Sequence, residues 1–201
     1  FVNMNAKEEE KKEKSIERLT KGINALASVG GTDIIFHPGF YLDSTKEEAF
    51  ESINEELGKL PVLENNFYRL ETTGKETQFG NLKELCELVK NHKHVKLCVD
   101  FSHIHARYVG ILKQYDDFAK IFDYIGENLG EEALKDIHVH LSGIEYTAKG
   151  EKNHLPFEES DFNIKDCLKA FLNYDVKGCI ICESPILEKD ALLMKNIYES
   201  L

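Results

Sequence analysis

The chain has 201 residues, of which 42% are hydrophobic and 30% charged, so it is long enough for one globular domain with its own core. A net charge of −11 and a count of three arginines (Arg18, Arg69 and Arg107) argue against a broad basic surface for nucleic acid. No apolar run is long enough for a transmembrane helix, and the N-terminus has no signal-peptide pattern, so we expect no membrane segment.

The cysteines indicate a reducing compartment. There are five, an odd number, scattered along a chain too long to need disulfides, so we expect a cytoplasmic protein. Cys179 and Cys182 have the spacing of a redox or zinc motif, but they lie in an apolar run that is typical of a strand. Positions three apart point to opposite faces of a strand, which predicts buried structural thiols instead.

Helix-like and strand-like segments alternate along the chain. An amphipathic pattern predicts a helix from Lys7 to about Ser28, a strand over residues 33–37, and a helix from Asp43–Thr45 to about Leu57. The order then repeats, with strands predicted over residues 67–71, 95–100, 137–141 and 178–183 and helices over 82–89, 115–125, 164–172 and 188–198. This alternation predicts βαβ units and a parallel sheet in one domain spanning residues 1–201. An irregular stretch over residues 142–161 follows a strand, where loops of parallel sheets are usually functional.

Polar residues of metal-ligand type stand at the ends of the predicted strands. They recur at intervals of roughly 30 to 40 residues, as expected for successive βα units of a barrel. They are His37, Glu71, Asp100, His140 and Glu183. Because the carboxyl ends of parallel barrel strands meet at one mouth, we expect these side chains to converge on a metal site. Imidazoles with carboxylates suit zinc, manganese or iron better than magnesium.

Three further histidines lie close to these strand ends in the sequence. His103 follows Asp100 closely enough to reach the same mouth, and His105 is either a ligand or a polar residue that starts the next connection. His138 shares a strand face with His140, so it either lines the barrel one layer deeper or is a hydrogen-bonded core or supporting histidine.

The strand-end phrases also carry a family resemblance. They read Phe36-His37-Pro38-Gly39, Glu71-Thr72-Thr73-Gly74 followed by Gly80, Asp100-Phe101-Ser102-His103, His140-Leu141 and Glu183-Ser184. In this order they resemble endonuclease IV, particularly its shorter archaeal-type relatives, over nearly the whole chain. The resemblance implies a TIM (β/α)₈ barrel and three zinc ions. It also implies cleavage of DNA 5′ to abasic sites in base-excision repair.

The resemblance assigns roles to individual residues. Glu71 would bridge the first and second metals, and His37 would bind the first. Asp100, His140 and Glu183 would complete the second, with Glu71 and Glu183 catalytic. His103 would bind the third, together with His154. We expect zinc in two or three copies, with manganese as a substitute, in a monomer that acts on abasic DNA.

This sequence departs from the family pattern in two places. Where the family has Asp-x-His, this chain reads Lys152-Asn153-His154, and Glu151 is one position away as a candidate carboxylate. Phe1 to Met4 resembles the tail of a family segment, so we expect about three barrel strands, and one histidine ligand, to precede this chain. The first strands of the barrel would then be missing here.

Other functions stay open on the sequence. A Glu-Asp-His-Glu set at strand ends also serves single-metal sugar isomerases and epimerases of the xylose isomerase-like superfamily, with Glu71 and Glu183 as acid and base. A third interpretation is a barrel relative without catalysis. Contact with DNA rests on lysines in loops after strands, with Arg107 and Tyr108 beside them; the lysines are otherwise ordinary solvated side chains. These lysines are Lys75, Lys113, Lys149 and Lys152.

Overall fold

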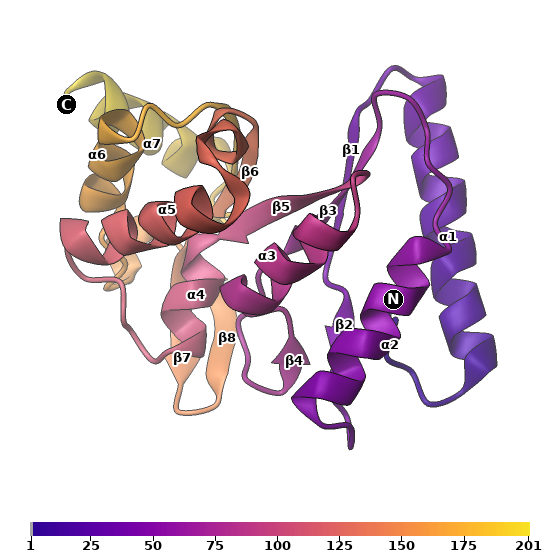
Figure 1. Cartoon of the computed structure of the whole chain (residues 1–201). Coiled ribbons are helices and arrows are strands. Elements are labelled where there is room, and N and C mark those ends of the chain that lie inside the picture. Colours follow the sequence, from indigo (N-terminus) through magenta and orange to yellow (C-terminus); the bar gives the residue numbers. More distant parts are fainter. Residues whose placement is uncertain (1) are drawn as a thin grey trace. The chain divides into compact units, whose positions relative to one another are not determined.

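The structure is a computed structural model that describes residues 2–201. The chain forms two compact units, the first made of residues 2–73 and 77–98, the second of residues 74–76 and 99–201. Helices and strands alternate in both (Figure 1). Among the described residues, no helix combines the length and apolarity that crossing a membrane requires.

The first unit is built on three parallel strands. Strand β1 (Asp33–Phe36) pairs with β3 (Phe67–Glu71), and β3 pairs with residues 95–98 of β5 (Val95–Asp100), whose last two residues are counted in the second unit. Its other elements are the helices α1 (Glu9–Ser28), α2 (Lys46–Gly58) and α3 (Leu82–Asn91) and a short antiparallel pair, β2 (Gly39–Phe40) with β4 (Gln78–Phe79). Apolar side chains of the helices and strands form a buried core that includes Leu19, Ile23, Ile53, Leu57, Tyr68, Leu70 and Leu85.

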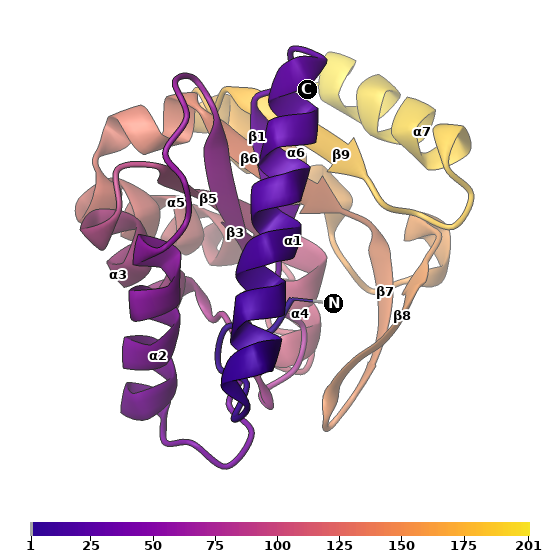
Figure 2. The same cartoon turned by 90° about the vertical axis from the view of Figure 1, so that its right-hand side faces the viewer.

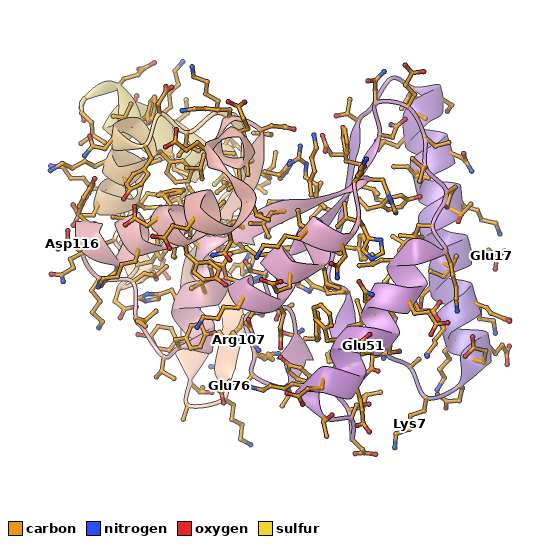
Figure 3. The ribbon with its side chains drawn as sticks, viewed as in Figure 1. Lys7, Glu17, Glu51, Glu76, Arg107 and Asp116 are labelled. Atoms are coloured by element: carbon orange, nitrogen blue, oxygen red, sulfur yellow. The ribbon has the colours of Figure 1, made fainter. Side chains whose placement is uncertain are left out.

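Capping boxes fix the start of two helices in this unit. The Thr45 hydroxyl accepts from the Glu48 N–H at 3.2 Å, and the Glu48 carboxylate accepts from the Thr45 N–H at 2.8 Å. Asn81 and Glu84 do the same for α3, with both bonds at 3.0 Å. These reciprocal bonds satisfy amides that have no partner inside the helix. Glu17 on α1 and Glu51 on α2 are exposed at the surface of the unit (Figure 3).

The second unit pairs β6 (Ile137–Leu141) with β9 (Gly178–Cys182) in parallel. Its other elements are α4 (Phe101–Arg107), α5 (Tyr115–Leu129), the 3₁₀ turns η1 (Glu131–Lys135) and η2 (Phe157–Glu159), α6 (Ile164–Asn173), α7 (Glu188–Glu199), and the antiparallel hairpin of β7 (Gly143–Thr147) and β8 (Gly150–Leu155). Figure 2 shows α7 beside β9 and the hairpin as a long two-stranded arm. An aromatic cluster of Phe101, Phe118, Phe122 and Phe171 forms its core.

The structure contains every strand and helix that the sequence predicts, with small shifts at their ends; α1, for instance, begins at Glu9. Two differences matter for the site. The stretch over residues 142–161 is not irregular, since most of it is the β7–β8 hairpin. The short helix α4 directly follows Asp100 and has no predicted counterpart.

The prediction for the cysteine pair was wrong. Cys179 is exposed and Cys182 is half-buried, while Cys86, Cys98 and Cys167 are buried as expected. Opposite faces of a strand are buried only where both are covered, and residues Gly178–Ile181 of β9 are exposed despite their apolar character. None of the five cysteines forms a disulfide.

Candidate metal centre

His37 and Glu71 lie in the first unit, and their side chains meet. Glu71 ends β3 and His37 follows the end of β1, which pairs with β3 so that Phe36 lies opposite Leu70. One further step along this register places His37 opposite Glu71. The His37 Nε2 is 3.2 Å from Glu71 Oε2. The predicted strand-end juxtaposition is therefore present for this pair.

The remaining strand-end candidates lie in the second unit. Asp100 ends β5, His140 is near the end of β6, and Glu183 follows β9. One donor atom from each lies within 4.8 Å of the others, and His140 Nδ1 is 3.3 Å from Glu183 Oε1. Asp100 and His140 are buried, whereas the Glu183 side chain is 32% exposed. We call these three residues the strand-end set.

Asp100 also starts helix α4. Its Oδ1 accepts from the His103 backbone N–H at 2.7 Å, which is the bond of an N-cap. Its Oδ2 lies 3.4 Å from His103 Nδ1. The Asp100 carboxylate thus fixes the backbone of His103 and lies close to its ring, so α4, which the sequence did not predict, brings His103 to the site.

A second group of donors comes from α4 and the hairpin. His103 Nε2 lies 3.5 Å from His154 Nε2 and 3.7 Å from Glu151 Oε2. We call His103, His154 and Glu151 the hairpin set. His154 Nδ1 donates to the Glu183 carbonyl at 3.0 Å, which leaves the lone pair on Nε2 facing His103. This bond also joins the two sets.

The spacing of the two imidazoles fits a shared ion. Two nitrogens bound tetrahedrally to one zinc at 2.0–2.1 Å are about 3.3 Å apart. The 3.5 Å between His103 Nε2 and His154 Nε2 is close to this value. Two imidazoles with a carboxylate are also the donor types that zinc, manganese and iron prefer. The chemistry of the residues therefore fits a divalent transition-metal ion.

A β-bulge places Glu151 in the hairpin set. In the β7–β8 pairing, Glu145 lies opposite Asn153 and Tyr146 opposite Glu151, so Lys152 is an extra residue. In a regular strand Glu151 and His154, three positions apart, would point to opposite faces. The bulge restores them to the same face, because one extra residue resets the alternation.

The bulged strand is held by the segment over residues 74–76. The Glu151 N–H donates to the Gly74 carbonyl at 2.9 Å. A Cβ on Gly74 would collide with the Glu151 side chain, so glycine permits this close approach. Arg107, at the end of α4, donates through Nη1 to the Lys75 carbonyl at 2.5 Å, and Figure 3 shows it beside Glu76.

Other candidate residues lie outside both sets. His138 is buried, with its ring centroid 5.3 Å from that of His140. His105 has no exposed surface; its Nδ1 accepts from the Leu112 N–H and its Nε2 donates to Asp161, each at 3.0 Å. Burial lowers the pKa of His105, against the opposing effect of Asp161.

Four of the residues considered for DNA contact differ in exposure. Arg107 is buried and Lys75 is half-buried. Tyr108 is 45% exposed. Lys152 is exposed, with its Nζ 2.5 Å from Glu145 Oε1.

Residues 1–197 match the family described as the xylose isomerase-like TIM barrel. The chain belongs to this family. An uncharacterized protein of Methanocaldococcus jannaschii is 46% identical to it over 206 residues, which cover 100% of this chain and 75% of the relative. The family membership confirms the predicted TIM-barrel fold class.

Proteins named as endonucleases and a protein named as epimerase-like are both similar to this chain. A probable endonuclease 4 of Staphylococcus carnosus is 28% identical over 188 residues, which cover 89% of this chain and 61% of that protein. The chain thus spans less than two thirds of the endonuclease's length. Endonuclease IV from Thermus thermophilus has a similar fold, with a TM-score of 0.74 at 22% identity, covering 100% of this chain and 73% of that one. The structure of a D-tagatose 3-epimerase-like protein also has a similar fold, with a TM-score of 0.69 at 19% identity. The match covers 99% of this chain and 72% of that one.

Proposed function

We propose that this protein is a metal-dependent phosphodiesterase of the endonuclease IV type that hydrolyses DNA 5′ to abasic sites. The observation that carries the proposal is the presence of two adjoining donor sets in the second unit. Their six donor residues exceed the four ligands that one zinc ion usually takes. The similarity to proteins named probable endonuclease 4 supports the choice of this reaction within the family.

The proposed metal ligands extend beyond the second unit. The strand-end pattern of the sequence adds His37 and Glu71, and the 3.2 Å between their donor atoms is consistent with a role in metal binding. We propose two or three ions in all, zinc being the first candidate and manganese the second. When bound, such ions polarise a phosphodiester and supply a nucleophile from water at neutral pH.

Glu71 and Glu183 are the proposed catalytic carboxylates. The Glu183 N–H donates to the Leu141 carbonyl at 2.9 Å, and its carbonyl accepts from His154, so its backbone is fixed at both ends. Its half-exposed carboxylate is oriented by His140 and is accessible to a substrate. It is therefore suited to holding the proton that an attacking water loses.

DNA contact would be local because the net charge of the chain is −11. Tyr108, Lys75 and Lys152 are the proposed contacts, with the exposed Tyr108 ring suited to stacking on a base. Arg107 would act indirectly, because its guanidinium holds the backbone at Lys75.

A second candidate is a single-metal sugar isomerase or epimerase. The strand-end set alone offers enough ligands for one ion, and the fold likeness to an epimerase-like protein is nearly as strong as that to the endonuclease. In this reaction Glu71 and Glu183 would move protons next to a carbonyl. About one ion per chain favours the isomerase, and two or three favour the nuclease.

The proposal is tested by incubating the purified protein with zinc or manganese and a duplex that contains one abasic-site analogue. We expect cleavage 5′ to the analogue, none in the matched intact duplex, and at least a 100-fold loss in Glu183→Gln. Glu158→Gln, an exposed carboxylate elsewhere in the same unit, is the matched control. If the folded protein cleaves at no metal loading, the proposal is wrong.

A further inference from the structure

A polar network centred on Asp161 ties α4 to the β7–β8 hairpin. The Asp161 Oδ1 accepts from His105 Nε2 at 3.0 Å, and its Oδ2 accepts from the Tyr146 hydroxyl at 2.7 Å. Lys113 Nζ lies 3.5 Å from the same Oδ2. One carboxylate thus joins a helix residue to a strand residue.

The network has a defined arrangement of hydrogens. His105 Nδ1 accepts from the Leu112 N–H, so the neutral ring carries its hydrogen on Nε2 and donates to Asp161. The His105 ring is fully buried and packs edge-on against Tyr146, with 5.3 Å between ring centroids. The Tyr146 hydroxyl also packs against Gly110, where a Cβ would collide with it. These contacts leave each ring one orientation.

The two elements that Asp161 joins are those that carry the hairpin set. His103 lies on α4 two residues before His105. Tyr146 is the cross-strand partner of Glu151 at the bulge. Since the Tyr146 hydroxyl is bonded to Asp161, the same contact fixes the strand that presents Glu151 and His154 to His103.

We propose that Asp161 is a positioning residue for an ion held by His103, His154 and Glu151. It touches none of these donors and acts through His105 and Tyr146. The role rests on the proposed function, because it requires the hairpin set to bind metal. Groups that orient metal ligands typically change metal affinity by 10- to 100-fold when they are replaced.

The test compares zinc binding by metal-free wild type, Asp161→Ala, Asp161→Asn and Tyr146→Phe, using a competing chromophoric chelator. We expect Asp161→Ala to weaken the hairpin-set ion by roughly 10- to 100-fold and to leave the strand-end ion unchanged. Asp161→Asn should recover most of the affinity, because its amide oxygen accepts from His105 and its amide N–H donates to the Tyr146 oxygen. Glu158→Ala, an exposed carboxylate near Asp161 in the chain, is the matched control.

Cobalt substitution gives a second measurement. The absorption spectrum of cobalt bound by the hairpin set should differ from that of wild type in Asp161→Ala and match it in Asp161→Asn. Equal zinc affinity and equal cobalt spectra in wild type and Asp161→Ala overturn the positioning role. If Asp161→Ala does not fold, Tyr146→Phe decides by the same criteria, because it removes one hydroxyl. A wild type that binds fewer than two ions overturns the proposed function, and the positioning role with it.

Discussion

The two donor sets of the second unit are built in different ways. The donors of the strand-end set stand at or next to the carboxyl ends of β5, β6 and β9, where the sequence pattern of successive strands places them. The hairpin set depends on a helix cap at Asp100, a β-bulge at Lys152 and the Asp161 network. The first is a property of the fold, and the second is added to it by local geometry.

The largest expected effect comes from Asp100, which serves both sets. Asp100→Ala removes one donor of the strand-end set and the bond that starts α4 at His103. We expect the ions of both sets to be lost, together with about 1 kcal/mol of stability from the missing cap. Metal content and thermal unfolding measure the two effects.

The matched control for this change is Asp116→Ala, an exposed aspartate in the first turn of α5 (Figure 3). It should keep both ions. Retention of the hairpin-set ion in Asp100→Ala would contradict the dependence of His103 on this cap.

The bulge gives a smaller and sharper test. Glu151→Gln should weaken the hairpin-set ion by about 10-fold or more, since it replaces a charged ligand by a neutral one. Deleting Lys152 removes the extra residue and leaves Glu151 two positions from His154, on the same face of a regular strand. The deletion should therefore keep the ion.

Zinc titration of the two variants checks this pair of expectations. If deletion of Lys152 abolishes the hairpin-set ion while the protein stays folded, the bulge does more than set the face of Glu151, and the role assigned to it is wrong.

The smallest effect on metal binding is expected at a contact between the backbone segments next to both sets, which itself binds no metal. The buried Ser102 hydroxyl donates to the Ser142 carbonyl at 2.7 Å and accepts from the Ser142 N–H at 2.8 Å. Ser102→Ala leaves both backbone groups without this partner, at a cost of about 1–3 kcal/mol. Chemical denaturation should show this loss with the number of bound ions unchanged. A loss of bound metal at unchanged stability would contradict the assignment of Ser102 to a structural role.

The sequence predicted the strand-end set because it needs two regularities, the alternation of strands with helices and the position of a polar residue where each strand ends. Asp100, His140 and Glu183 meet both. The same reasoning placed His37 beside Glu71, whose side chains are in contact.

The hairpin set could be predicted in part. His103 is predicted from its position three residues after a strand end and from the family resemblance, His154 from the resemblance alone, and Glu151 from its nearness to the expected carboxylate. The bulge that turns Glu151 to the His154 face has no signal in the sequence around Lys152, because it depends on the register with β7. Helix α4 is too short to show a helical period, and its signal is the Asp100 cap.

Elemental analysis of wild type, His140→Ala and His154→Ala tests most directly whether the two donor sets hold separate ions. We expect at least two ions per chain in wild type and about one fewer in each variant. His140→Ala should lose the strand-end ion and His154→Ala the hairpin-set ion. Equal metal content in all three folded proteins, or a wild type with a single ion, would contradict separate ions in the two sets.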